Sequence, residues 1–115
     1  MKLFPANMSY AQALRSGHLG KIEDRRYLDW VKTLPCCSCH APADDPHHMW
    51  SRGYNGHGSR SPDYFAIPLC RACHDGLHRD VNAWESLHGP QIEHVALTLL
   101  RAICEEKLVT ARRGG

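Results

Sequence analysis

Apolar side chains recur at helical spacing toward the C-terminal end of the chain. In PQIEHVALTLLRAICEEKL, residues 90–108, apolar residues stand at 92, 95, 96, 99, 100 and 103. This period predicts an amphipathic helix that packs its apolar stripe on a core, and Pro90 suits its first turn. Just upstream, Asp80 can cap a shorter helix that runs through Trp84 and Leu87 and ends at Gly89.

A second periodic segment, KIEDRRYLDWVKTLP, lies closer to the N-terminus. Its period predicts a helix over 22–34 that Pro35 ends. The apolar and aromatic positions that carry this prediction are Ile22, Tyr27, Leu28, Trp30, Val31 and Leu34. Residues 1–21 show no sustained period, and Gly17 and Gly20 would break a helix there, so we predict an N-terminal arm.

The middle of the chain follows a different pattern. PHHMW, residues 46–50, is a candidate for a short strand, and YFAIPLC, residues 64–70, is a candidate for a second strand that closes a hairpin. The segment between them, Ser51 to Asp63, is rich in glycine and serine and is predicted to be a loop. A helix should then begin near Arg71.

These elements predict one small α+β domain over 1–115. Its core, 35–80, is flanked by the helix at 22–34 and by C-terminal helices within 81–110, and 111–115 form a tail. Folding a chain of 115 residues buries about 65% of the unfolded surface, so the core is modest and a structural metal would support it.

The composition is ordinary for a globular protein, with 43% hydrophobic and 23% charged residues. The start, MKLFPANMSY, has no apolar stretch of signal-peptide length, and VALTLL is too short to span a bilayer. We therefore expect a cytoplasmic protein with no membrane partner.

Six cysteines in a chain without a secretion signal argue against a disulfide scaffold. Four of them form two C-x-x-C pairs, Cys36 with Cys39 and Cys70 with Cys73, which is the ligand pattern of a structural Zn²⁺ site. The 30 residues between the pairs leave room for an inserted hairpin. A redox pair would need only one C-x-x-C, and mixed ligand sets that use His40 or His74 are alternatives.

Two cysteines lie outside this pattern. Cys37 stands between the ligands of the first pair. Cys104 falls in the predicted C-terminal helix, where we expect a buried, inert thiol.

If the cysteines hold the zinc, the histidines at 47, 48, 74 and 78 remain to be explained. His74 and His78 are four residues apart on one predicted helix, so they can bind one ion together. Neighbours on a regular strand point to opposite faces, so His47 and His48 share a site only at a strand end or a bulge. If the strand is regular, we retain His48 as the catalytic residue.

These residues resemble the HNH, or ββα-metal, endonuclease superfamily. The resemblance rests on PHHM at 46–49, IPLCRACH at 67–74 and His78, and it covers roughly 35–80. The spacing from His48 to His74 is similar to that of bacterial colicin DNases. More narrowly, DRRYLDWVKTLPCCSC, ADDPHH and PLCRACHDGLHRD resemble small phage and prophage nucleases of the Ref-like recombination type.

The resemblance implies a metal-dependent DNA endonuclease. His48 would be the general base that takes a proton from the attacking water, and His47, His74 and His78 would hold one divalent metal ion. That ion would be Mg²⁺, Mn²⁺, Ni²⁺ or Zn²⁺, and three imidazoles suit the last three better than Mg²⁺. A carboxylate in the shell would shift this preference; the candidates are Asp45, Asp63 and Asp75.

The implied partners are DNA and a recombinase filament or another phage protein, in the cytoplasm of the host cell. The products would carry 5′-phosphate and 3′-hydroxyl ends. One departure from the family concerns its middle asparagine, whose place nine residues before His74 holds Phe65. The function of that asparagine in pinning the loop would pass to Asp63 or Tyr64, or be absent.

Net charge is only +2 with neutral histidines, so overall charge does not indicate nucleic-acid binding. Locally, 46–79 carry four arginines and five histidines against two aspartates. The candidate phosphate contacts are Arg52, His57, Arg60, Arg71 and Arg79. We expect Trp50 and Trp84 to be packing residues.

Two other functions fit parts of the pattern. A non-catalytic zinc module that binds nucleic acid or a protein partner would need the cysteines but not the four extra histidines. A redox or metal-storage protein would leave the hairpin and the H-x-x-x-H spacing unexplained. The histidines therefore favour the nuclease.

Overall fold

The fold is known from a computed structural model that describes residues 6–54 and 60–108. Two short strands, β1 (Asp45–His48) and β2 (Ala66–Leu69), pair antiparallel at its centre. The register places His47 opposite Ile67 and His48 opposite Ala66. The predicted hairpin and small α+β class are confirmed.

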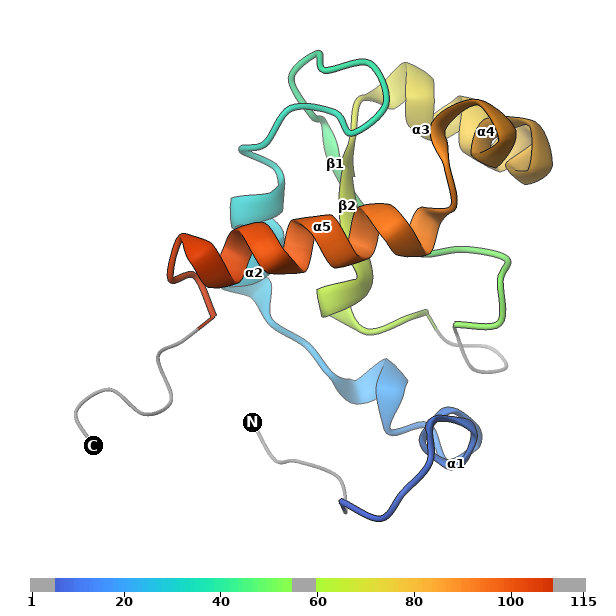
Figure 1. Cartoon of the computed structure of the whole chain (residues 1–115), viewed down its shortest axis with the longest axis vertical. Coiled ribbons are helices and arrows are strands. Elements are labelled where there is room, and N and C mark those ends of the chain that lie inside the picture. The colour runs from blue at the N-terminus through green and yellow to red at the C-terminus, as the bar shows by residue number, and fades with distance from the viewer. Residues whose placement is uncertain (1–5, 55–59, 109–115) are drawn as a thin grey trace.

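Helices cover the hairpin on both sides. In Figure 1, α5 (Gln91–Cys104) crosses in front of β2 and α2 (Arg25–Val31) lies behind it; both contact this strand. All four residues of β2 are therefore buried, which explains why AIPL carries no polar side chain. No helix within the described ranges is both long and apolar enough to cross a bilayer.

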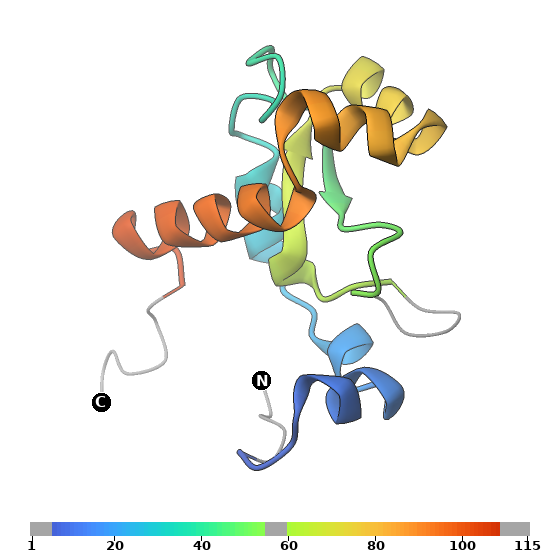
Figure 2. The same cartoon turned by 45° about the vertical axis from the view of Figure 1, so that its right-hand side comes forward.

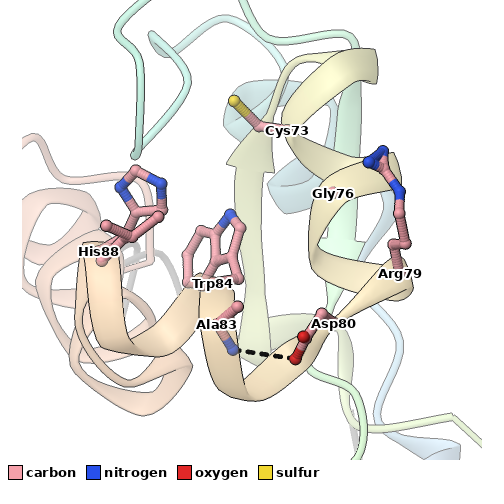
Figure 3. Close-up of a pocket in the computed structure, with 8 residues that line it drawn as sticks. Cys73, Gly76, Arg79, Asp80, Ala83, Trp84 and His88 are labelled. Carbon is pink, nitrogen blue, oxygen red and sulfur yellow. Dashed lines mark hydrogen bonds between the residues drawn. The ribbon is translucent and has the colours of Figure 1, made fainter.

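The predicted helices after the hairpin are confirmed, and their caps follow the sequence. Helix α3 (Arg71–Arg79) begins directly after β2, and α4 (Val81–His88) begins after its N-cap Asp80, whose carboxylate accepts a hydrogen bond from the Ala83 N–H at 3.0 Å (Figure 3). Helix α4 ends at Gly89, whose φ of +91° suits glycine. Figure 2 shows α3 and α4 side by side at one end of the hairpin.

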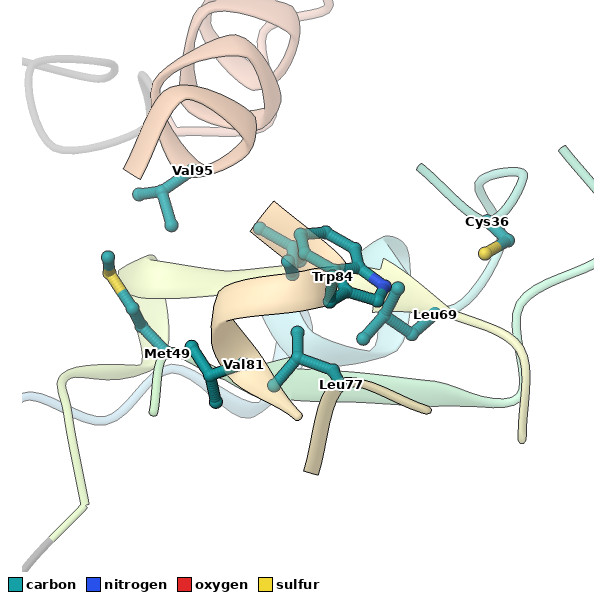
Figure 4. Packing of buried hydrophobic residues seen from close by; sticks show 8 residues of the cluster. Cys36, Met49, Leu69, Leu77, Val81, Trp84 and Val95 are labelled. Carbon is teal, nitrogen blue, oxygen red and sulfur yellow. The ribbon is translucent and has the colours of Figure 1, made fainter. Parts of the chain in front are cut away.

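The main core forms where these helices meet the hairpin. Leu77 of α3, Trp84 of α4 and Val95 of α5 join Leu69 of β2 in one cluster, and Figure 4 shows Trp84 beside Leu69 with Leu77 next to them. Met49 and Cys36 belong to the same cluster. A second, smaller cluster joins α2 to α5 through Tyr27, Val31 and Ala102. Trp84 is buried, as expected.

The N-terminal predictions need two corrections. Part of the expected arm is helical: α1 (Tyr10–Arg15) precedes a 3-10 turn, η1 (Leu19–Lys21). Ser9 and Gln12 form a capping box that starts α1, and this local signal outweighs the lack of a long apolar period. The helix predicted over 22–34 is shorter, because Asp24 caps it by accepting from the Tyr27 N–H and it ends at Val31.

The buried face of α5 also differs from the predicted stripe. The helix buries Gln91, Val95, Thr98 and Ala102, whereas Leu100 and Ile103 are 59% and 51% exposed. A two-stranded sheet offers α5 only a narrow surface, and Gln91 is held inward by hydrogen bonds described below. Cys104 is exposed, so the expectation of a buried thiol was wrong.

A cavity of about 330 Å³ lies between α3 and α4 (Figure 3). Its lining includes Arg79, Trp84 and His88, but none of the histidines at 47, 74 and 78. Cys73 of the paired cysteines also lines it, so the cavity borders that cysteine and is separate from these histidines.

Leu77 and Leu87 form a matched pair for testing the core. Leu77 of α3 is fully buried and Leu87 of α4 is 79% exposed. We expect Leu77→Ala to lower the free energy of unfolding by about 2–5 kcal/mol, because it leaves a cavity at the centre of the fold. Leu87→Ala should change it by about 0.5 kcal/mol or less. Urea unfolding of the zinc-loaded protein measures both, and equal losses would contradict this core.

Candidate functional site

The four paired cysteines come from two turns at the same end of the hairpin. The first turn, 36–39, is closed by a bridge between Pro35 and Pro42 and by the Cys36 N–H, which donates to the Ala41 carbonyl at 2.6 Å. The second turn is the start of α3, where Cys70 is the N-cap. The Cys37 N–H donates to the Pro68 carbonyl at 2.9 Å and so fixes the first turn against the end of β2, just before Cys70.

The geometry of the four sulfur atoms fits a tetrahedral zinc ion. The Sγ atoms of Cys36, Cys39, Cys70 and Cys73 all lie within 4.8 Å of one another, and those of Cys39 and Cys70 are 3.6 Å apart. Zinc–sulfur bonds of about 2.3 Å place tetrahedral ligands about 3.8 Å apart. The cluster can thus bind a metal such as zinc. His74 belongs to a different cluster, so a mixed ligand set that uses it is not favoured.

The electrostatics of this cluster also fit a cation. Burial acts to raise the pKa of Cys36, but hydrogen bonds from the Ser38 hydroxyl and from backbone N–H groups outweigh it and lower that pKa to about 6. Burial and the neighbouring thiols raise the pKa of Cys73 to about 12. Cys36 therefore forms a thiolate readily at neutral pH, whereas Cys73 needs a positive charge near its sulfur atom to ionise.

Three histidines form a second cluster beside the first. His47 comes from β1 and His74 and His78 come from α3, and one ring nitrogen of each lies within 4.8 Å of the others. Their ring centroids are 4.8–5.3 Å apart. The spacing predicted that His74 and His78 share one helix face, and the resemblance implied that His47 joins them; the structure brings these three imidazoles together. Burial is the largest cause that lowers the pKa of His47, to about 4, and of His78, so both imidazoles favour the neutral form that ligates metals.

Hydrogen bonds fix the outer ring nitrogens of two of these histidines. His74 Nδ1 lies 2.9 Å from a carboxylate oxygen of Asp45, and His47 Nε2 lies 3.1 Å from the amide oxygen of Gln91. Both partners are acceptors, so these nitrogens carry the protons. The inner nitrogens, His47 Nδ1 and His74 Nε2, are then bare and face each other at 3.1 Å. Two lone pairs at this distance repel unless a cation or a proton lies between them.

The three carboxylate candidates are not members of this cluster. Asp45 contacts His74 through its outer nitrogen, and Asp63 contacts His48 rather than the three-histidine cluster. Asp75 is exposed on α3. Of the two candidate packing tryptophans, Trp50 is 39% exposed, and its ring centroid lies 4.4 Å from that of His78 at the edge of the cluster.

His48 points away from the cluster that contains His47. It is the last residue of β1, and its Nε2 lies 2.8 Å from Oδ1 of the buried Asp63. The other carboxylate oxygen of Asp63 accepts a hydrogen bond from the Asp24 N–H at 2.7 Å. His48 is the last residue of β1, the position at which the two histidines could have shared a site. The strand is nevertheless regular, so His47 and His48 have different partners.

The candidate phosphate contacts are scattered, and several already have partners. Arg52 donates to Glu85 at 3.0 Å and to Asn82 at 2.6 Å, and Arg71 donates to Asp45 at 3.0 Å. Arg60 lies 3.6 Å from Glu23 and 3.7 Å from Asp63, and Arg79 lines the cavity between α3 and α4. His57 lies outside the described residues.

Gln91 is the site residue that the sequence did not reveal. It follows Pro90 at the start of a helix, and nothing in its spacing relates it to His47, which is 44 positions away. Only the packing of α5 against the hairpin brings the two together. Asp63, by contrast, was already one of the candidates from the sequence.

The fold and the site define a small α+β protein in which one helix, α3, carries residues of both the four-cysteine cluster and the three-histidine cluster. The chain belongs to the family described as "Protein of unknown function (DUF968)", which matches residues 10–105. It is similar to "Uncharacterized protein YdfU" of Escherichia coli (strain K12), with 45% identity over 78 residues. That match covers 68% of this chain and 22% of the relative, so the chain spans about a fifth of the relative's length. No solved structure matches the chain.

Replacing one cysteine ligand should unfold the protein. We expect Cys70→Ser to bind no zinc and to lose most of its helical circular dichroism, because this sulfur would ligate the ion and also caps α3. Cys104→Ser is the matched control, since Cys104 is exposed and lies outside the cluster. A Cys70→Ser protein that keeps one zinc per chain would contradict the four-cysteine site.

The pH dependence of stability should report on His47. Its pKa is about 4 in the folded protein and ordinarily 6.5, so the unfolded chain binds more protons between these values. The contribution of neutral His47 to the free energy of unfolding is therefore fully present above pH 6.5. It is lost as the pH drops toward 4, which lowers that free energy by up to about 3 kcal/mol. Urea unfolding at several pH values, with zinc only on the cysteines, should show a shallower slope for His47→Gln. An unchanged slope would contradict the burial of a neutral His47.

Proposed function

We propose that this protein is a metal-dependent endonuclease of the HNH class that hydrolyses DNA phosphodiester bonds. The observation that carries the proposal is the 3.1 Å approach of His47 Nδ1 to His74 Nε2, with both outer ring nitrogens bound to acceptors and with His78 beside them. Two imidazoles whose outer nitrogens are both fixed by acceptors are suited to holding a divalent cation between their inner nitrogens.

The order of elements supports the same proposal. A strand ending in two histidines, a loop, a returning strand and a helix with two further histidines follow one another along the chain. This is the ββα arrangement expected of an HNH core. In the proposal, the four-cysteine zinc is structural, because it joins the turn at 36–39 to the start of α3.

His47, His74 and His78 would hold the catalytic ion, and their neutral imidazoles favour Mn²⁺, Ni²⁺ or Zn²⁺ over Mg²⁺. A bound divalent ion would supply positive charge to the scissile phosphate and to the leaving 3′ oxygen. The protein's own contribution is to fix the three rings, through Asp45 on one side and Gln91 on the other.

His48 would act as the general base. With its Nε2 proton donated to Asp63, its Nδ1 is the nitrogen that can accept a proton from water. The buried carboxylate holds the ring in this tautomer and stabilises the imidazolium that forms after proton transfer. Asp63 is itself held by the Asp24 N–H, so the pair is anchored to the start of α2. In this proposal Asp63 takes over the function of the missing asparagine.

The biological setting follows from the resemblance of 24–39, 43–48 and 68–80 to Ref-like nucleases. We propose DNA recombination or processing in a phage or prophage context, with DNA as substrate. A recombinase filament or another phage protein would recruit the enzyme. Arg60, Arg71 and Arg79 remain candidate phosphate contacts at the surface.

A cleavage assay tests the proposal. Protein that retains one zinc is incubated with supercoiled plasmid and with single-stranded DNA, alone and with added Mg²⁺, Mn²⁺, Ni²⁺ or Zn²⁺. We expect metal-dependent cutting that His48→Ala reduces by at least about 100-fold, because the general base is lost. His48→Ala should keep its fold and its structural zinc.

His88→Ala is the matched control, since this histidine lies at the end of α4 and belongs to neither cluster. It should cut like the wild-type protein. A His48→Ala protein that cuts normally would remove His48 from the mechanism. If the folded, zinc-loaded wild-type protein cuts neither the plasmid nor the single-stranded DNA with any of the metals, the result would instead favour a non-catalytic zinc module.

A further inference from the structure

Gln91 is a fully buried polar residue at the first position of α5. Its side-chain amide lies between the Trp50 backbone and His47. The Trp50 N–H donates to the amide oxygen at 3.1 Å, and the amide nitrogen donates to the Trp50 carbonyl at 2.9 Å. The same amide oxygen lies 3.1 Å from His47 Nε2.

The contacts with Trp50 settle the orientation of the Gln91 amide. A backbone N–H can only donate and a backbone carbonyl can only accept, so the amide oxygen must face the Trp50 N–H and, with it, His47. His47 Nε2 must then carry a proton in order to bond that oxygen. Its Nδ1 is left bare toward His74.

We propose that Gln91 is a positioning residue for the histidine cluster: it locks His47 in the Nε2–H tautomer and points Nδ1 at the ion. The inference rests on the proposed function only in that the three histidines bind a metal. It makes the start of α5 part of the site, although α5 provides no ligand.

Two further residues hold Gln91 in place. Glu85 of α4 accepts hydrogen bonds from the Gln91 backbone N–H at 3.0 Å and from its amide nitrogen at 3.2 Å. Arg52 in turn donates to Glu85 at 3.0 Å and balances its charge. A continuous chain of hydrogen bonds thus runs from the start of the glycine-rich loop through α4 and α5 to His47. This contact assigns Arg52 a supporting role within the site.

The test compares Gln91→Met with Thr98→Val. Methionine keeps the bulk of glutamine but cannot bond His47, whereas Thr98 is another buried polar residue of α5 that bonds only the His94 carbonyl. Ni²⁺ is titrated calorimetrically into zinc-loaded protein. We expect Gln91→Met to weaken Ni²⁺ binding by about 10–100-fold, the usual effect of losing an outer partner of a metal-ligating histidine. Thr98→Val should bind Ni²⁺ like the wild-type protein.

The His47 tautomer provides a readout that a merely structural role would not move. In long-range ¹H–¹⁵N spectra of wild-type protein without Ni²⁺, His47 should show the Nε2–H pattern, and this measurement needs no variant. In Gln91→Met it should become a mixture of tautomers. An Nδ1–H pattern in the wild-type protein would overturn the inference, as would equal Ni²⁺ affinities of Gln91→Met and Thr98→Val.

These outcomes are separate from those of the cleavage assay. A wild-type protein that binds Ni²⁺ at the histidines but cuts no DNA would contradict the proposed nuclease activity. The role of Gln91 would then still be tested by the Ni²⁺ affinities of the variants and by the tautomer of His47. Conversely, a wild-type protein that cuts DNA while Gln91→Met binds Ni²⁺ and cuts equally well would keep the nuclease and remove Gln91.

Discussion

The meeting of four cysteine sulfur atoms at one end of the hairpin is the constraint on which the rest of the structure depends. It joins the turn at 36–39 to the first turn of α3, two segments that are far apart in sequence. Because Cys70 is both a member of the cluster and the N-cap, the start of α3 is fixed at this point. His74 and His78 follow at fixed helical positions, so the sulfur cluster also determines where the histidine cluster forms.

The strand alternation divides the chemistry between two neighbours. His47 points toward α3 and α5, where burial keeps it neutral and Gln91 fixes its tautomer. His48, one residue later at the strand end, points toward Asp63. The proposed ligand and the proposed base therefore have different environments although they are adjacent. Each strand of the hairpin has only four residues. The two environments come from neighbouring segments: Gln91 of α5 places an amide beside His47, and the turn before β2 places the Asp63 carboxylate beside His48.

The sequence predicted the parts of this structure that depend on local signals. The C-x-x-C pairs, the H-x-x-x-H spacing, the Asp80 cap and Gly89 each act within a few residues, and the structure has them as predicted. The sequence did not predict which face of α5 is buried, because that depends on the width of a two-stranded sheet and on Gln91. It also missed α1, whose capping box is short and lacks an apolar period. The extent of the domain, the nuclease activity and the cytoplasmic location stay predictions.

We propose that this chain holds two separate metal sites, one with sulfur ligands and one with nitrogen ligands. X-ray absorption spectroscopy at the Zn and Ni edges tests it most directly, on protein loaded first with one equivalent of Zn²⁺ and then with one of Ni²⁺. We predict a zinc shell of four sulfur atoms at about 2.3 Å and a nickel shell of imidazole nitrogens without sulfur. A mixed sulfur and nitrogen shell around zinc, with no tightly bound nickel, would contradict the account.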